Sequence, residues 1–84
     1  MKITKEQAQL VAKLLKITED EAVKYSHDIE GVDAVYISIP EKGGESMFVS
    51  PDLEVLYAIS SVSFNQHLEA YKSGMRTPLE AFEE

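Results

Sequence analysis

The sequence contains no cysteine and no tryptophan, and its 84 residues include only four glycines and three prolines. The absence of cysteine excludes disulfides, thiolate metal sites and thiol nucleophiles, so the fold must be held by packing alone. The lysine-containing start, MKITKEQAQLVAKLLK, has neither the apolar core of a signal peptide nor the length of a membrane span. These absences predict a soluble cytoplasmic protein with no membrane partner.

Positive charge is also scarce. Fifteen Asp and Glu residues stand against eight Lys and Arg residues, which gives a formal net charge of −7. Nucleic-acid binding is driven mainly by Lys and Arg contacts that release counterions from phosphates, so this balance disfavours a nucleic-acid partner. It favours a basic protein partner, and six of the carboxylates are concentrated in residues 19–33.

The length predicts one domain over residues 1–84. A chain of this size buries only about 60 to 65% of its unfolded surface and has no material for a second core. Hydrophobic residues at 44% and charged residues at 27% are close to globular averages, so the chain is expected to fold.

Three segments carry the capping-box pattern, in which a Ser or Thr stands three residues before a Gln or Glu at a helix start. The pairs are Thr4 with Gln7, Thr18 with Glu21, and Ser63 with Gln66. They predict an N-terminal helix with a broad apolar stripe, a short second helix ending near His27, and a C-terminal helix ending at Gly74. Pro78 predicts one further short turn close to the C-terminus.

Between these helices lie three runs of alternating apolar residues, AVYISI, ESMFVS and EVLYAIS. Alternation with period two is typical of strands, and the runs are separated by turn-forming residues. The sequence therefore predicts an α+β fold: one or two N-terminal helices, a three-stranded antiparallel β-meander, and a C-terminal helix packed on the sheet. The segment HDIEGVDA before the first run is expected to be a loop.

The glycine pair Gly43-Gly44 tests the register of the first hairpin. A two-residue turn would pair Ile39 with Phe48 and bury Ser50, whereas a three-residue loop pairs Ile39 with Met47 and places apolar residues on one face. The hydrophobic pattern favours the three-residue loop, which also pairs Ile37 with Val49. A strand and not a helix follows the glycines, so a phosphate-binding loop is disfavoured.

That register divides the sheet into two faces. One is the expected core face, made of Val35, Ile37, Ile39, Met47, Val49, Val55, Tyr57 and Ile59. The other carries Tyr36, Phe48 and Leu56, and if helices cover only the core face these three form an exposed apolar patch. Such a patch predicts a partner surface or a dimer contact. The alternative is that a helix covers this face too.

A second contact is predicted at the acidic loop formed by Asp28, Glu30 and Asp33. With His27 these residues could suggest a metal site, but they lack the twelve-residue spacing of a calcium loop. Ser63 precedes His67 by one helical turn, yet a serine that caps a helix is not an activated nucleophile. The sequence thus predicts no catalytic residue, no cofactor and no metal.

The two N-terminal helices also suggest a helix-turn-helix. In that arrangement the second helix would present Glu19, Asp20 and Glu21 to DNA phosphates, which would repel them. DNA binding is therefore the weaker alternative to protein binding.

The stretch EVLYAISSVSFNQHLEAYKSG runs from a predicted strand into a capped helix. Together with the preceding strands, over residues 32–74, this layout resembles small bacterial immunity-type proteins of the YrhB-like kind. The resemblance implies a protein that neutralises a toxin by binding it and has no chemistry of its own. It carries over no functional residue. The sequence thus predicts an acidic, non-catalytic protein-binding module, with a homodimer through the sheet face as the alternative.

Overall fold

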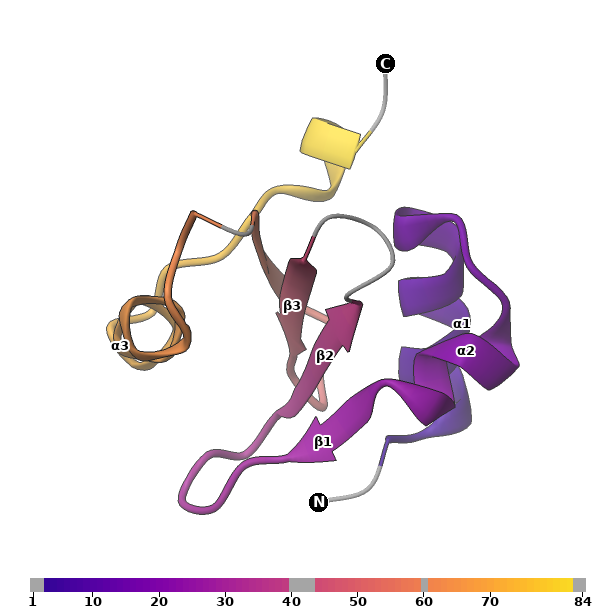
Figure 1. Cartoon of the computed structure of the whole chain (residues 1–84), viewed down its shortest axis with the longest axis horizontal. Helices are drawn as coiled ribbons and strands as arrows, with labels where there is room; N and C mark the ends of the chain where they lie inside the picture. The colour runs from indigo at the N-terminus through magenta and orange to yellow at the C-terminus, as the bar shows by residue number, and fades with distance from the viewer. Residues whose placement is uncertain (1–2, 40–43, 60, 83–84) are drawn as a thin grey trace.

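A four-stranded antiparallel sheet lies between two layers of helices (Figure 1). The computed structural model describes residues 3–39, 44–59 and 61–82. The strands follow the order β1-β2-β3-β4 and comprise β1 (Ser26–Asp28), β2 (Val35–Ile39), β3 (Glu45–Val49) and β4 (Val55–Ala58). The helices are α1 (Lys5–Leu15), α2 (Glu19–Lys24) and α3 (Phe64–Lys72), followed by a 3-10 turn, η2 (Leu79–Phe82). The predicted α+β class is confirmed.

The strand β1 is the difference from the predicted three-stranded meander. Ser26, expected at the end of the second helix, and His27 and Asp28, expected in a loop, pair antiparallel with β2, with Ser26 opposite Ile37. The second helix accordingly ends at Lys24 and does not reach His27. This strand is polar and only three residues long, so it is held by main-chain pairing and leaves no alternating pattern in the sequence.

The three predicted helix starts are confirmed. In each capping box the Ser or Thr side chain accepts a main-chain hydrogen bond, and the Gln or Glu side chain accepts one in return. These boxes are formed by Thr4 with Gln7, Thr18 with Glu21, and Ser63 with Gln66. The predicted stop at Gly74 is also confirmed: α3 ends at Lys72 with Ser73 as its C-cap, and Gly74 follows with a φ of 99°.

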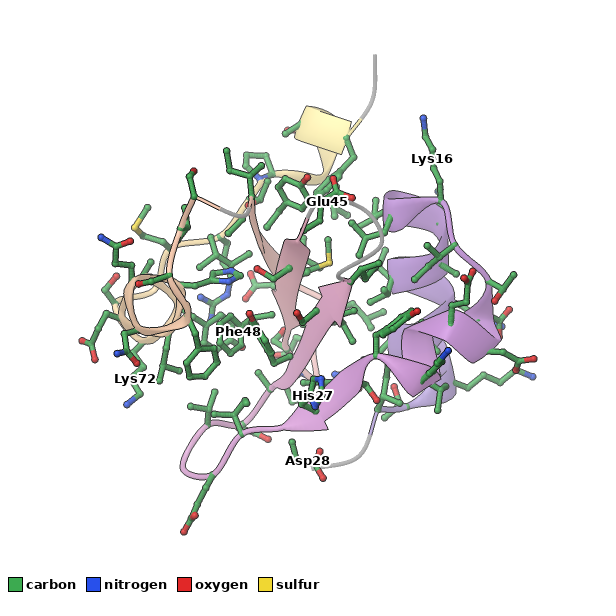
Figure 2. All side chains as sticks on the ribbon, in the orientation of Figure 1. Lys16, His27, Asp28, Glu45, Phe48 and Lys72 are labelled. Atoms are coloured by element: carbon green, nitrogen blue, oxygen red, sulfur yellow. The ribbon has the colours of Figure 1, made fainter. Side chains whose placement is uncertain are left out.

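One core cluster lies between the sheet and α3. Figure 2 shows Phe48 extending from the sheet toward α3. Its ring stacks on that of Tyr71 with the centroids 5.0 Å apart, and it meets the His67 ring edge-on at 4.7 Å. Leu56 and Ala34 complete the buried part of this cluster. The helix therefore covers the sheet face that had been expected to remain open.

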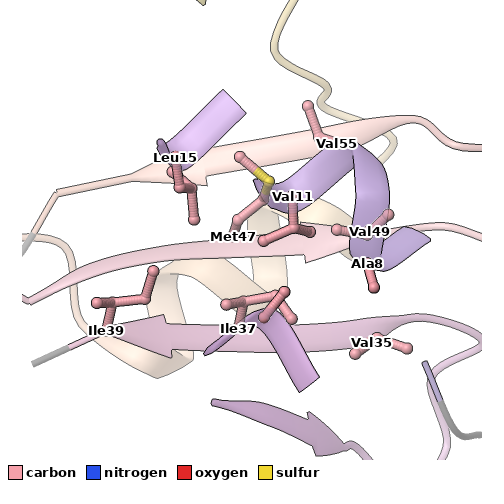
Figure 3. Packing of buried hydrophobic residues seen from close by; sticks show 10 residues of the cluster. Ala8, Val11, Leu15, Val35, Ile37, Ile39, Met47, Val49 and Val55 are labelled. Atoms are coloured by element: carbon pink, nitrogen blue, oxygen red, sulfur yellow. The ribbon is translucent and has the colours of Figure 1, made fainter. Parts of the chain in front are cut away.

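The other core cluster joins the sheet to α1 and α2 (Figure 3). Val11 and Leu15 of α1 pack onto strand residues that alternate inward, and α2 contributes Ala22. Six of the eight residues predicted for the core face are buried: Val35, Ile37, Ile39, Met47, Val49 and Val55. Tyr57 is half-buried. Ile59 was wrongly placed in the core: it is 54% exposed, because β4 ends at Ala58.

The predicted register of the first hairpin is wrong by two residues. Ile39 lies opposite Glu45, not Met47, and Ile37 lies opposite Met47, not Val49. A shift of two preserves the face of every side chain, so the division into faces holds although the pairing does not. Gly44 adopts a φ of 81°, as a left-handed loop position requires. Lys42 and Gly43 lie outside the described residues.

In the second hairpin Val49 lies opposite Val55 and Met47 opposite Tyr57, which keeps these side chains on the core face. Across the described part of the chain, no helix is both long and apolar enough to span a bilayer.

Candidate functional site

The apolar patch predicted at Tyr36, Phe48 and Leu56 is not an exposed surface. Phe48 is fully buried and Leu56 is 7% exposed, because α3 packs over both. Their side chains therefore cannot contact a partner or a second copy while the fold is intact. The alternative, in which a helix also covers this face, describes the molecule correctly, and the helix is the C-terminal one.

Tyr36 is the one member of that patch that remains half-buried. It lies beside α3, where its ring meets Phe64 edge-to-face with the centroids 5.0 Å apart. On its other side lies the exposed His27 of β1, with ring centroids 6.3 Å apart. Tyr36 thus packs at the edge of the α3 cluster and does not form the centre of a binding patch.

The three acidic positions predicted as a contact loop are all exposed. Asp28 belongs to β1, whereas Glu30 and Asp33 lie in the connection between β1 and β2. The connection turns at Gly31, which has a φ of 80°, and the Val32 amide donates to the Ile29 carbonyl at 3.2 Å.

Apolar side chains anchor this connection to the core. Ile29 and Val32 pack against the α3 cluster, which fixes the loop between them. Their neighbours Glu30 and Asp33 are left exposed. The loop therefore presents its carboxylates from a backbone that Ile29 and Val32 anchor to the core.

A second acidic segment lies at the turn between β3 and β4. The Ser50 amide donates to the Glu54 carbonyl at 2.8 Å, and the Glu54 amide donates to the Ser50 hydroxyl at 3.0 Å. Leu53 completes the turn in the left-handed region with a φ of 66°. This closed turn leaves Asp52 and Glu54 exposed.

The two acidic segments converge beside the C-terminal end of α3. The carboxylates of Asp33, Glu54 and Asp52 are all close enough to Tyr71 to influence its hydroxyl. Burial is the main cause of the raised pKa of Tyr71; the Arg76 charge opposes that rise, and the three carboxylates add to it. We refer to Glu30, Asp33, Asp52 and Glu54 as the acidic surface.

Arg76 is the cation at the border of the acidic surface. Its guanidinium lies 3.8 Å from the centre of the Tyr71 ring, and its Nε is 3.7 Å from a Glu54 carboxylate oxygen. One terminal nitrogen also donates to the Tyr71 carbonyl at 3.0 Å. These contacts hold Arg76 in place, so it offsets part of the charge of Glu54 and leaves the other carboxylates of the surface exposed.

A hollow of about 300 Å³ lies at the opposite end of the sheet, between the end of α1 and η2. On its wall the Tyr57 hydroxyl donates to the Glu45 carboxylate. Burial, this hydrogen bond and the Glu45 charge raise the pKa of Tyr57 to about 12. A phenol held protonated in this way is a poor general base near neutral pH.

Ser46 and His67 form a serine–histidine contact that the sequence did not predict. The Ser46 hydroxyl lies 3.2 Å from His67 Nδ1, and both residues are buried. The sequence had instead drawn attention to Ser63, which caps α3 as expected. Because Ser46 and His67 are enclosed between the sheet and α3, a substrate cannot reach them, and the contact is structural. Ser46 belongs to β3 and His67 to α3, so this contact could be recognised only from the way these two elements pack together.

Two further alternatives can be compared with the structure. No cluster of three or more His, Asp and Glu side chains capable of holding a metal ion is found among residues 3–39, 44–59 and 61–82. In the helix-turn-helix reading, α2 is only six residues long and carries Glu19, Asp20 and Glu21 in its first turn. These carboxylates would face the phosphates of DNA, which is unfavourable.

Comparison of the chain with protein-family models, with curated proteins and with solved structures finds no significant match.

Proposed function

We propose that this chain is a non-catalytic protein-binding module that acts in the cytoplasm and binds a basic protein partner through the acidic surface. The observation that carries this proposal is that two separate loops each place a carboxylate beside Arg76: Asp33 lines the same hollow as Arg76, and a Glu54 carboxylate oxygen lies 3.7 Å from the Arg76 Nε. Hydrogen bonds within both loops define their backbones, so the carboxylates project from defined positions of the main chain.

Carboxylates grouped on one surface create a negative potential that speeds encounter with a positive surface and selects against acidic partners. The net charge of −7 adds to this field over longer distances. A shallow hollow of about 350 Å³ adjoins Asp33 and is lined by Gly31, Val32, Asp33, Tyr71, Lys72 and Arg76. Because Lys72 and Arg76 are basic, the hollow offers a partner a concave shape beside the acidic surface and adds no negative charge beyond that of Asp33.

The proposed mode of action agrees with the layout that resembles immunity-type proteins of the YrhB-like kind. In that role the partner is a basic, nuclease-like toxin, and binding alone neutralises it. No chemical step is needed from the module, which fits the burial of the Ser46 and His67 pair.

The test compares two neutralised variants of the full chain in affinity capture from an extract of the native cells. The first removes three charges of the acidic surface by Glu30→Gln, Asp33→Asn and Asp52→Asn. The matched control removes three charges from the other helix layer by Glu6→Gln, Glu19→Gln and Asp20→Asn. All six positions are exposed, and each set lowers the net negative charge equally.

The wild-type chain and the control should retain a basic protein at low salt, and the acidic-surface variant should lose it. Raising the salt should weaken the retained contact, because screening shortens the range of exposed charges. Circular dichroism verifies that both variants are folded. Equal capture of the same basic protein by both variants would exclude the acidic surface, and capture of no basic protein by the wild-type chain would count against the proposed function.

A further inference from the structure

The two edges of the sheet differ in chemistry. At one edge, β1 is three residues long and carries the exposed polar residues His27 and Asp28, features that discourage pairing with another strand. At the other edge, β4 is the uncharged run Val55–Ala58, and the exposed apolar residue Ile59 follows its last residue. An apolar edge strand of this kind pairs readily with a further strand unless something covers it.

A segment that follows α3 covers β4. The Thr77 amide donates to the Val55 carbonyl at 2.8 Å, and the Tyr57 amide donates to the Thr77 hydroxyl at 2.9 Å. These two groups of β4 therefore point away from β3, along the outer edge of the sheet. Thr77 forms hydrogen bonds with both groups, as one residue of a fifth strand would. Its amide is the donor, and its side-chain hydroxyl is the acceptor that a main-chain carbonyl would provide in a strand. Pro78 follows and has no amide to continue the pairing.

This covering segment, residues 75–82, is tied to the end of α3 at its start, where the Met75 amide donates to the Ala70 carbonyl at 3.1 Å and Arg76 contacts Tyr71 and Glu54. Its later residues contact the sheet through Thr77 and Phe82. Arg76 lies over the Tyr71 ring, and the Phe82 ring meets Tyr57 edge-to-face with the centroids 5.6 Å apart. Met75 is 59% exposed, and η2 buries none of its residues. Hollows of about 320 Å³ and 300 Å³ adjoin Thr77. In Figure 1 the yellow segment runs from α3 across the end of the sheet toward α1.

We propose that residues 75–82 are a displaceable cover, and that β4, once uncovered, pairs antiparallel with β4 of a second copy of this chain. The hydrogen bonds of Val55 and Tyr57 with Thr77 identify the groups that would pair. A twofold arrangement centred on Tyr57 places each Val55 opposite Ile59 of the other copy. The two sheets then join into one of eight strands.

The composition of β4 favours a second copy over a basic partner at this edge. Residues 55–59 contain no charged side chain, so two such strands meet without like charges opposite each other. A basic segment would gain no ion pair along this run. The net charge of −7 on each copy makes two copies repel each other. Salt screens this repulsion and should therefore strengthen the dimer.

The test uses full-length Thr77→Pro, which removes both the amide donor and the hydroxyl that occupy β4. Thr77→Ser keeps both groups and is the matched control. Sedimentation should show dimers of Thr77→Pro with an affinity at least about tenfold above that of the wild-type and control chains, since losing two hydrogen bonds changes an equilibrium by this order. Added salt should raise that affinity. Hydrogen exchange should show the Tyr57 amide protected in the dimer.

A folded Thr77→Pro chain that stays monomeric up to about 1 mM would overturn the proposal. So would a dimer in which the Tyr57 amide exchanges freely, or a wild-type chain that dimerises as tightly as the variant. If Thr77→Pro does not fold, Thr77→Val removes the hydroxyl alone and should still dimerise more tightly than Thr77→Ser. Equal dimer affinities of Thr77→Val and Thr77→Ser would show that the Thr77 hydroxyl does not keep β4 from pairing.

Discussion

His67 donates a hydrogen bond from Nε2 to the main-chain carbonyl of Leu56 at 2.7 Å. A carbonyl can only accept, so the proton resides on Nε2 in the neutral ring, and Nδ1 is left to accept from the Ser46 hydroxyl at 3.2 Å. The ring thus joins α3 to β3 and β4 at once, inside a cluster of aromatic side chains. The fold depends on this histidine remaining uncharged.

The first prediction is that the protein loses stability as the pH falls below about 6.5, the ordinary pKa of histidine. Burial lowers the pKa of His67 in the folded chain, and the hydrogen bond to Leu56 opposes that shift only in part. Above the unfolded pKa both states are neutral and the stabilisation is complete. Below it the unfolded chain binds the proton first, so stability decreases as the pH approaches the folded pKa.

Urea unfolding between about pH 7.5 and 5.5 measures this dependence. The variant His67→Gln removes the titrating ring and should flatten the curve in that range, at some cost in stability. His27→Gln is the matched control, because His27 is exposed on β1, and it should keep the wild-type slope. A wild-type slope in His67→Gln would assign the dependence to other groups.

The second prediction concerns Phe48, which α3 covers completely. Phe48→Ala should lower the free energy of unfolding by about 3–5 kcal/mol, as expected for a buried aromatic residue. Phe48→Asp should unfold the chain, because it places a carboxylate among apolar side chains without a partner. Val23→Asp is the control: Val23 is 52% exposed, and its replacement should change stability by less than about 0.5 kcal/mol. Thermal melts followed by circular dichroism separate these outcomes, and a folded Phe48→Asp chain would contradict the position of α3.

Local rules were sufficient for much of this fold. A capping box involves groups within three residues of each other, so Thr4 with Gln7 and Ser63 with Gln66 could be read correctly from the sequence. Alternation along β2 likewise separates inward from outward side chains with no knowledge of what packs on them. Each of these signals depends only on residues that are close together in the sequence.

The features that the sequence did not reveal depend on distant segments. A register shift of two residues leaves Ile37 on the same face, so the hydrophobic pattern cannot distinguish Met47 from Val49 as its partner. The burial of Phe48 depends on which face α3 covers, and both faces of the sheet are apolar enough to accept a helix. The grouping of Asp33 with Asp52 needs two loops, between β1 and β2 and between β3 and β4, which lie at the same end of the sheet because Val35 pairs with Val49 and Val49 with Val55. None of these three features produces a repeating pattern of residues that could be recognised in the sequence.

The third prediction concerns Lys16, which ends α1 with a φ of 58° and a ψ of 46°. This left-handed conformation is unfavourable for a residue with a Cβ, and glycine is preferred after a helix for that reason. Lys16→Gly should therefore raise the free energy of unfolding by about 0.5–1 kcal/mol. Lys13→Gly is the matched control within the helix and should lower it by about 1 kcal/mol. Chemical denaturation measures both, and a loss of stability in Lys16→Gly would mean that its side chain is needed there.

The fourth prediction concerns Gln7, which is fully buried although it is polar. Its amide nitrogen donates to the carbonyls of Ser50 at 2.9 Å and Val49 at 3.3 Å, so it ties the start of α1 to the end of β3. Its oxygen accepts from the Thr4 amide at 2.9 Å. One side chain thus serves both the capping box and the contact between helix and sheet.

Gln7→Glu preserves the size of the side chain and its cap acceptor but replaces the donor with an oxygen. At neutral pH a carboxylate would then face two carbonyl oxygens in a buried site, which should cost about 3 kcal/mol or more. Gln9→Glu makes the same change at an exposed position of α1 and should alter stability by less than about 0.5 kcal/mol. Because a protonated carboxyl can donate to a carbonyl, lowering the pH toward 5 should narrow the gap between the two variants. Equal unfolding free energies for the two variants at neutral pH would show that the amide of Gln7 does not hold α1 to the sheet.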